Sequence, residues 1–276
     1  MIISFLQTLD KNIGQAVEQL SYKLFEGDLY TFALNVQVSI KPIALVILSV
    51  CFVFEFIKIT MKADILKWET GLQIAAKFTL AYFAMDISFY LLSAIYQTAV
   101  EWVQSIAALN ATSFSFSDQI DAALKTALEK YGILDSIGLL ATLGISFFVV
   151  WATGLLIYVM AYARTFELMI YIAVSPLPCA FILLEDSGSR LFKKFIMNFA
   201  AVSIQGLFMI ITIQLYVIIV KGEIDKLVPA APAAPTAAPT TVSVPEIASI
   251  MLLGSIILLV LTFKSGSLAK SLMDVG

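Results

Sequence analysis

Four charged side chains interrupt long apolar stretches of this sequence and are its first candidates for chemistry: Glu55, Lys77, Asp86 and Glu167. A charge in an apolar environment is costly unless it is paired or serves a function. Glu55 lies three residues before Lys58, and Glu167 lies three residues after Arg164. Because residues three apart share one face of a helix, we expect each carboxylate to form a structural ion pair with its basic neighbour.

Asp86 differs from the other carboxylates because it lies near the middle of its apolar stretch, with Tyr82 and Tyr90 one helical turn to either side. Proton relay, structural hydrogen bonding and pore lining are all open to it. Asn198 and Gln205 are seven residues apart and share a helix face, which favours hydrogen bonds between helices. We predict that four side chains line a pore or a polar bundle interior: Asp86, Lys77, Asn198 and Gln205.

The sequence lacks the residues that most enzyme mechanisms need. It contains no histidine, which removes the commonest general base and metal ligand, and no nucleotide-binding glycine motif. Cys51 and Cys179 each lie in an apolar stretch without a second ligand nearby, so we expect packing roles for both. We therefore predict no catalytic residues, no metal and no cofactor, and we expect that the chain is not an enzyme. Grooves between its helices could hold a phospholipid.

The composition predicts an integral membrane protein. Of the 276 residues, 60% are hydrophobic and 13% are charged, whereas soluble domains are about half apolar and about a quarter charged. A membrane helix needs about 20 mostly apolar residues. Six blocks reach or approach that length: residues 40–59, 72–99, 133–161, 166–184, 195–220 and 247–263.

Basic loops and two prolines predict the topology. Two clusters should face the cytoplasm: Lys58, Lys62 and Lys67, and Arg190, Lys193 and Lys194. Three blocks separate these clusters, but two cytoplasmic loops require an even number of crossings. Pro176 and Pro178 interrupt the fourth block, and each removes a helical hydrogen bond. We therefore predict five crossings with a broken or re-entrant fourth block, an outside N-terminus and a cytoplasmic C-terminus. Six simple spans are the alternative.

The predicted fold is an all-α polytopic bundle of five to six spans with four segments along the chain. Residues 1–30 form an amphipathic helix, which could lie on the membrane, pack on a neighbouring subunit or cover its own bundle. Residues 40–220 form the transmembrane core, with an outer loop over residues 101–131 that should hold a short helix. Residues 221–246 form a Pro- and Ala-rich outer linker, and residues 247–276 form the last span and a cytoplasmic tail.

The layout resembles the TrbL-type polytopic membrane subunits of type IV secretion systems, particularly those of Gram-positive conjugative elements. The shared features are the amphipathic N-terminal segment, the basic first loop, the long outer loop, the string ARTFELMIYIAVSPLPCAFILLE and the closing string FKSGSLAKSLMDVG. The resemblance covers nearly the whole chain, although none of these strings has the specificity of a metal or nucleotide motif.

The resemblance implies a structural and channel subunit in the cytoplasmic membrane that assists the translocation of relaxase-bound single-stranded DNA or protein. It also implies a homo-oligomer in contact with membrane lipid, a secretion ATPase, a coupling protein and other conjugation membrane subunits, with translocated DNA touching the chain at most transiently. The alternative is a small-solute transporter or permease subunit, which Asp86 and the broken helix would favour.

Overall fold

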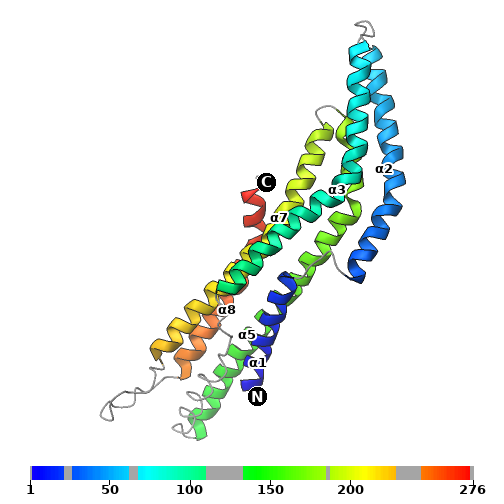
Figure 1. Cartoon of the computed structure of the whole chain (residues 1–276). Coiled ribbons are helices and arrows are strands. Elements are labelled where there is room, and N and C mark those ends of the chain that lie inside the picture. The colour runs from blue at the N-terminus through cyan, green and yellow to red at the C-terminus, as the bar shows by residue number, and fades with distance from the viewer. Residues whose placement is uncertain are drawn as a thin grey trace. The chain divides into compact units, whose positions relative to one another are not determined.

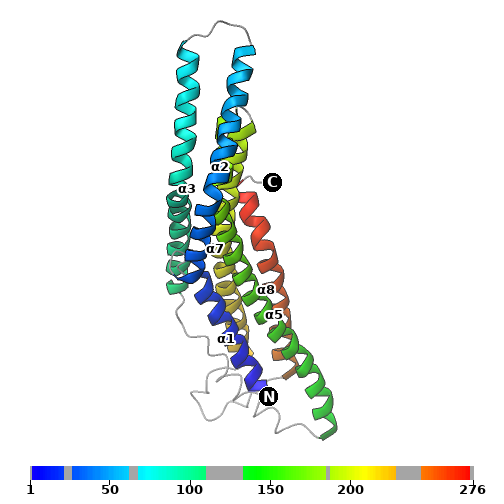
Figure 2. The same ribbon diagram turned by 90° about the vertical axis from the view of Figure 1, so that its right-hand side faces the viewer.

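The protein is an assembly of long α-helices (Figures 1 and 2). The computed structural model describes residues 2–21, 27–61, 68–109, 133–184, 187–227 and 244–273, and it contains no strand within these ranges. The elements in chain order are α1 (Ile2–Leu20), α2 (Asp28–Met61), α3 (Trp68–Leu109), α5 (Ile133–Val174), α6 (Pro176–Ala180), the 3₁₀ turn η1 (Phe181–Leu183), α7 (Ser187–Leu227) and α8 (Val244–Leu272). The prediction of an all-α fold is confirmed.

Within the described residues, five segments are long and apolar enough to cross a membrane: Asp28–Lys58, Gly71–Leu109, Gly144–Leu183, Gly188–Val220 and Ala248–Leu272. The third runs through α5, α6 and η1, so the third and fourth predicted blocks together form one span. The predicted total of five spans is therefore confirmed, and the alternative of six simple spans is wrong. The fourth block is broken, as predicted, but it continues the third block and is not a separate re-entrant segment.

Several helices are longer than a bilayer requires. α3 and α5 have 42 residues each and α7 has 41, which corresponds to about 63 Å at 1.5 Å per residue. The hydrocarbon core is about 30 Å thick, so such helices are tilted or extend beyond it. α3 continues to Leu109 and takes in the first part of the predicted outer loop. The remainder of that loop and residues 228–243 of the Pro-rich linker lie outside the described residues.

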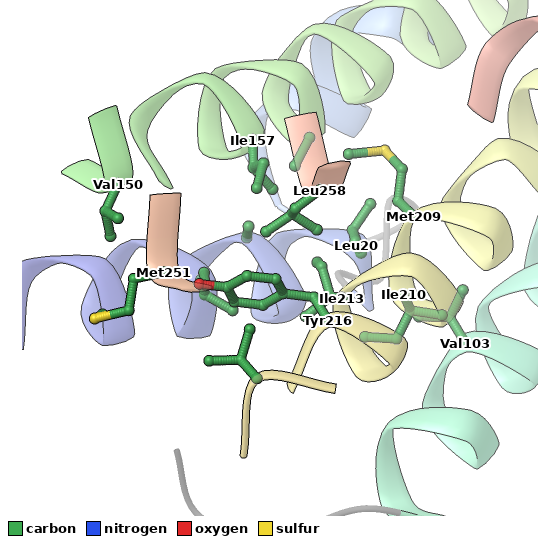
Figure 3. Close-up of a cluster of buried hydrophobic side chains, with 14 of the residues drawn as sticks. Leu20, Val103, Val150, Ile157, Met209, Ile210, Ile213, Tyr216, Met251 and Leu258 are labelled. Atoms are coloured by element: carbon green, nitrogen blue, oxygen red, sulfur yellow. The ribbon is translucent and has the colours of Figure 1, made fainter. Parts of the chain in front are cut away.

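The chain forms two compact units, and α3, α5, α7 and α8 contribute residues to both. Unit 1 comprises Met1–Ser21, Trp102–Ala163 and Gly206–Ser265. Its core contains buried side chains of α1, α3, α5, α7 and α8 (Figure 3). Ile13, Ala16 and Leu20 of α1 are completely buried in this core. The apolar face of α1 therefore covers its own bundle, which was one of the three placements left open by the sequence.

Unit 1 also contains a close approach of two helices. A Cβ added at Gly254 of α8 would lie 3.0 Å from Cγ2 of Val220 and 3.1 Å from Cε2 of Tyr216, both on α7. Figure 1 shows α8 lying along the second half of α7. Small residues allow membrane helices to approach closely, so Gly254 sets the spacing of this pair.

Unit 2 comprises Tyr22–Glu101, Arg164–Gln205 and Gly266–Gly276. Its described residues form two apolar clusters. One joins α2, α3, α5 and α7 around Leu92, Tyr96 and Phe199, and the other packs α6 and η1 against α2 and α3. α2 begins after Gly27, whose φ of 96° is a conformation that glycine adopts readily. Both predicted candidates for packing, Cys51 and Cys179, are buried free thiols in the second cluster.

Candidate functional site

The predicted helix break is centred on Ser175 in unit 2. α5 ends at Val174, and α6 begins at Pro176. Pro176 has no N–H to donate to Ile172, and the Ser175 N–H donates to the Ile172 carbonyl instead at 3.3 Å. Pro178 likewise leaves the Val174 carbonyl without its helical donor. Pro176 and Pro178 therefore end one helix and start another, because a proline suits the first turn of a helix.

Buried polar side chains from two other helices surround this break. The Gln37 amide of α2 donates from Nε2 to Oγ of Ser175 at 3.2 Å, and the Ser88 hydroxyl of α3 lies 3.3 Å from the same atom. Ser88 also donates to the Met85 carbonyl at 2.9 Å. All three hydrogen-bonding residues are buried, with Ser175 completely inaccessible. This cluster ties α2, α3 and the broken helix together through polar contacts that satisfy one another.

Cys179 extends the polar cluster by one turn of α6. Its Sγ lies 3.3 Å from the Ser175 carbonyl and 3.6 Å from the Ala84 carbonyl of α3. A buried thiol of this kind acts as a small apolar group with a weak donor. The part of the chain that the structure describes holds no group of three or more His, Cys, Asp or Glu side chains able to bind a metal.

A tight turn follows the break. Leu184 adopts an extended backbone, and its N–H donates to the Phe181 carbonyl at 3.0 Å. The Gly188 N–H then donates to the Leu184 carbonyl at 3.1 Å. A Cβ at Gly188 would lie only 1.5 Å from the carbonyl oxygen of Phe181, so this turn requires glycine.

Arg164 is buried within α5 and is the second polar feature of unit 2. Its Nε donates to the Val202 carbonyl at 3.0 Å and its Nη2 to the Ser203 carbonyl at 2.9 Å, both on α7. The guanidinium carbon also lies 6.0 Å from the ring centroid of Tyr96 on α3. The predicted pair of Arg164 with Glu167 is wrong within the described residues, because Glu167 is exposed and the guanidinium turns to these carbonyls.

The position of Arg164 explains why the sequence suggested two separate blocks there. The predicted gap covered residues 162–165, because a charged residue between apolar stretches is typical of a loop. Arg164 instead satisfies its charge against α7, so α5 continues through it to Val174.

Asp86 forms an ion pair with Lys41 of α2, and Nζ of Lys41 donates to Oδ1 of Asp86. The two side chains are 36% and 39% exposed, so the pair lies at the surface of unit 2 and not within its apolar clusters. Lys41 was not among the predicted residues because it stands at the edge of the first apolar block. A role of Asp86 in a pore stays a prediction.

The remaining candidates for the polar interior are spread over three places. Lys77 is exposed on α3, whereas Asn198 and Gln205 are half-buried on α7. In the described ranges neither of these two amides makes a hydrogen bond between helices. The Gln205 amide instead lies against α8, since a Cβ at Gly266 would be 3.3 Å from its Nε2. A shared polar interior of these residues with Asp86 stays a prediction.

The predicted pair of Glu55 and Lys58 is confirmed, with Nζ of Lys58 3.7 Å from Oε1 of Glu55. Glu55 is buried, and this oxygen accepts no hydrogen bond within the described residues.

The second predicted basic cluster is exposed at the start of α7, as a basic loop cluster should be, and consists of Arg190, Lys193 and Lys194. Lys62 and Lys67 lie outside the described residues, and the side of the membrane that the clusters face stays a prediction.

Three residues around the helix break were not among those predicted from the sequence: Gln37, Ser88 and Ser175. Isolated hydroxyl and amide residues are common in membrane helices, so none of them stands out alone. The polar cluster could have been predicted from the position of Ser175 directly before Pro176, because a broken helix leaves backbone groups unpaired that polar side chains can satisfy.

Together, five apolar spans, a buried helix break and buried polar contacts define a multi-pass helical membrane protein. A family described as TrbL/VirB6 plasmid conjugal transfer like protein matches residues 7–176, which is more than half of the chain. The chain belongs to this family. The match begins in α1 and ends at Pro176. Comparison with curated proteins and with solved structures gives no match.

Proposed function

We propose that this chain is a structural and channel subunit of a conjugative type IV secretion system in the cytoplasmic membrane. Its role is to assist the passage of relaxase-bound single-stranded DNA or of protein. The family match over residues 7–176 carries the proposal, because that family consists of conjugal transfer membrane proteins and is not a known family of enzymes.

Two structural features support a channel subunit. The five spans provide a membrane bundle, and Pro176 and Pro178 break one span beside buried hydrogen-bonding groups. Irregular backbone at membrane depth is tolerated where protein buries it or where it lines water. A break that polar neighbours satisfy is also a place where a bundle can change shape, which suits a component that admits a large substrate.

The proposed partners are a secretion ATPase, a coupling protein, other conjugation membrane subunits and further copies of the chain. Membrane lipid, including a phospholipid bound between helices, completes this set. Translocated DNA would touch the chain at most transiently, since the net charge of −3 offers no excess of cations to hold a polyanion.

The first experiment is purification of the tagged chain from its native membrane in mild detergent, followed by mass spectrometry. Recovery of a secretion ATPase, a coupling protein and other membrane subunits is expected. A donor cell that lacks the chain should lose DNA transfer, and the tagged chain should restore it.

The alternative, a small-solute transporter, predicts different results in the same material. The chain would then be recovered alone or with a solute-binding protein, and its loss would leave DNA transfer intact. Flux of a small solute into liposomes that contain the purified chain alone would overturn the channel-subunit proposal.

A further inference from the structure

A row of polar side chains runs along one exposed face of α3 within unit 2. The row, here named the α3 stripe, consists of Thr79, Tyr82, Asp86, Tyr90, Ser93 and Gln97. The spacings of three and four residues keep these positions on one side of a helix. All six lie in the span Gly71–Leu109, and they cover about 27 Å of helix at 1.5 Å per residue. The stripe therefore extends over nearly the whole thickness of a bilayer core, which is about 30 Å.

The side chains of the stripe are accessible in the isolated chain. Tyr82 is 40% exposed and Tyr90 is 70% exposed, and Ser93 alone among the six is half-buried. Within the described residues, the Tyr82 and Tyr90 hydroxyls and the Gln97 amide make no hydrogen bond. Asp86 adds a charge, which Lys41 of α2 neutralises.

A second exposed face on the same stretch of α3 has the opposite character. Leu80, Phe83, Ile87 and Leu91 are between 41% and 63% exposed. They lie about 100° around the helix from the stripe, because 3.6 residues make one turn. These side chains are suited to lipid, which indicates that this stretch of α3 lies at membrane depth.

The stripe cannot face the same lipid. A hydroxyl or amide without a hydrogen bond in hydrocarbon costs about 4–8 kcal/mol, and an ion pair at that depth adds its own desolvation cost. Close backbone approach of another helix fits poorly too, because such contacts between membrane helices use small residues. The stripe instead presents two tyrosines, a carboxylate and a glutamine. A second copy that hydrogen-bonded to the stripe would place Tyr82 or Tyr90 near the contact between copies.

We propose that the α3 stripe faces water in the assembled complex and forms part of the wall of its aqueous passage. This inference rests on the proposed channel role and assigns the face of the chain that serves it. The wall is polar but carries no net charge at its centre, because Lys41 and Asp86 neutralise each other. Such a surface neither repels nor retains a polyanion, which suits a substrate that must pass through.

Cysteine labelling in native membranes tests the proposal. One set of variants places a thiol on the stripe: Tyr82→Cys, Tyr90→Cys and Gln97→Cys. The matched control set places it on the apolar face: Leu80→Cys, Ile87→Cys and Leu91→Cys. The probe is a trimethylammonium thiosulfonate, which needs a thiolate in contact with water. The parent chain gives the baseline, because Cys51 and Cys179 are buried.

Stripe thiols should react at least about tenfold faster than the apolar-face thiols, a difference of about 1.4 kcal/mol in activation free energy. Equal rates on the two faces would overturn the proposal. Slow labelling of the stripe together with disulfide cross-links between two copies at Tyr82→Cys or Tyr90→Cys would also overturn it, in favour of contact between subunits. A stripe variant present below the parent level is replaced by Ser93→Cys on the same face.

The labelling result is separable from the test of function. Labelling needs assembled protein but no DNA transfer, whereas co-purification with a secretion ATPase needs no water at the stripe. Slow stripe labelling in a chain that still recovers its secretion partners would refute the water-facing stripe alone. Fast labelling in a chain that recovers no such partner would refute the proposed function alone.

Discussion

The guanidinium of Arg164 donates to the carbonyl oxygen of Ser203 at 2.9 Å, and it thereby joins α5 to α7 inside unit 2. A second bond from Nε to the Val202 carbonyl uses the planar fork of the arginine. These carbonyls belong to a continuous helix, so the bonds from Arg164 are additional to the helical ones. The contact therefore stabilises the packing of the two helices but also keeps a charge buried.

The first prediction compares the stabilisation from the two Arg164 hydrogen bonds with the cost of burying its charge. Arg164→Lys retains the buried charge and loses at least one of the two bonds, so we expect a loss of about 1.5–3 kcal/mol in the free energy of unfolding. Arg164→Met removes both the charge and its desolvation cost, and we expect a smaller loss. Thermal unfolding of the purified chain in mild detergent measures both. A methionine variant less stable than the lysine variant would show that the charge itself is needed.

The second prediction concerns the turn after the helix break. Gly188→Ala would place Cβ 1.5 Å from the Phe181 carbonyl oxygen, a backbone atom that cannot move without opening the turn. We expect a loss above about 3 kcal/mol, the upper end for overpacking, and therefore a strong fall in protein level in the membrane. Gly144→Ala is the control, because a Cβ there meets nothing within 4 Å. Normal levels of the Gly188 variant would contradict the geometry of this turn.

The third prediction tests the polar cluster at Ser175. Gln37→Leu removes the amide that donates to the Ser175 hydroxyl and leaves Ser88 as its remaining side-chain partner, whereas Ser175→Ala leaves the Gln37 amide without its acceptor. Each unpaired buried group costs about 1–3 kcal/mol. We expect the double variant to be more stable than the sum of the two single losses predicts, by about 0.5 kcal/mol or more in thermal unfolding. Additive losses would mean that the two side chains do not interact.

Much of this architecture could be predicted from the sequence because membrane insertion leaves strong local signals. Apolar block length, the basic residues of two loops and the pair Pro176 and Pro178 were together sufficient for five spans. The helix through Arg164 was not predictable, because the α7 carbonyls that accept its bonds are 38 and 39 residues away. The partner of Ser175 on α2 is more distant still, 138 residues along the chain. Contacts of this kind depend on packing between helices, and local patterns such as apolar blocks or prolines do not show which distant residues will meet.

The fourth prediction concerns the placement of α1. Leu20 is completely buried in the core of unit 1, whereas Glu18 is exposed on the same helix. Leu20→Ala should reduce stability by about 2–5 kcal/mol, as for other large-to-small changes in a core. Glu18→Ala serves as the control and should change stability by less than about 0.5 kcal/mol. Equal effects of the two variants in thermal unfolding would indicate that α1 does not pack in this core.

The fifth prediction connects the helix break to transfer. Pro176→Ala with Pro178→Ala restores N–H donors for the Ile172 and Val174 carbonyls, so α5 should continue straight through Ser175. The polar cluster with Gln37 and Ser88 would then lose its geometry. We expect DNA transfer to fall by at least about tenfold, equivalent to about 1.4 kcal/mol, in a mating assay with the variant at parent level. Pro42→Ala is the matched control, because Pro42 lies on an exposed face within the continuous helix α2. Unchanged transfer by the double variant would show that the break serves only the packing of unit 2, and loss of transfer by the control would show that any helix proline matters.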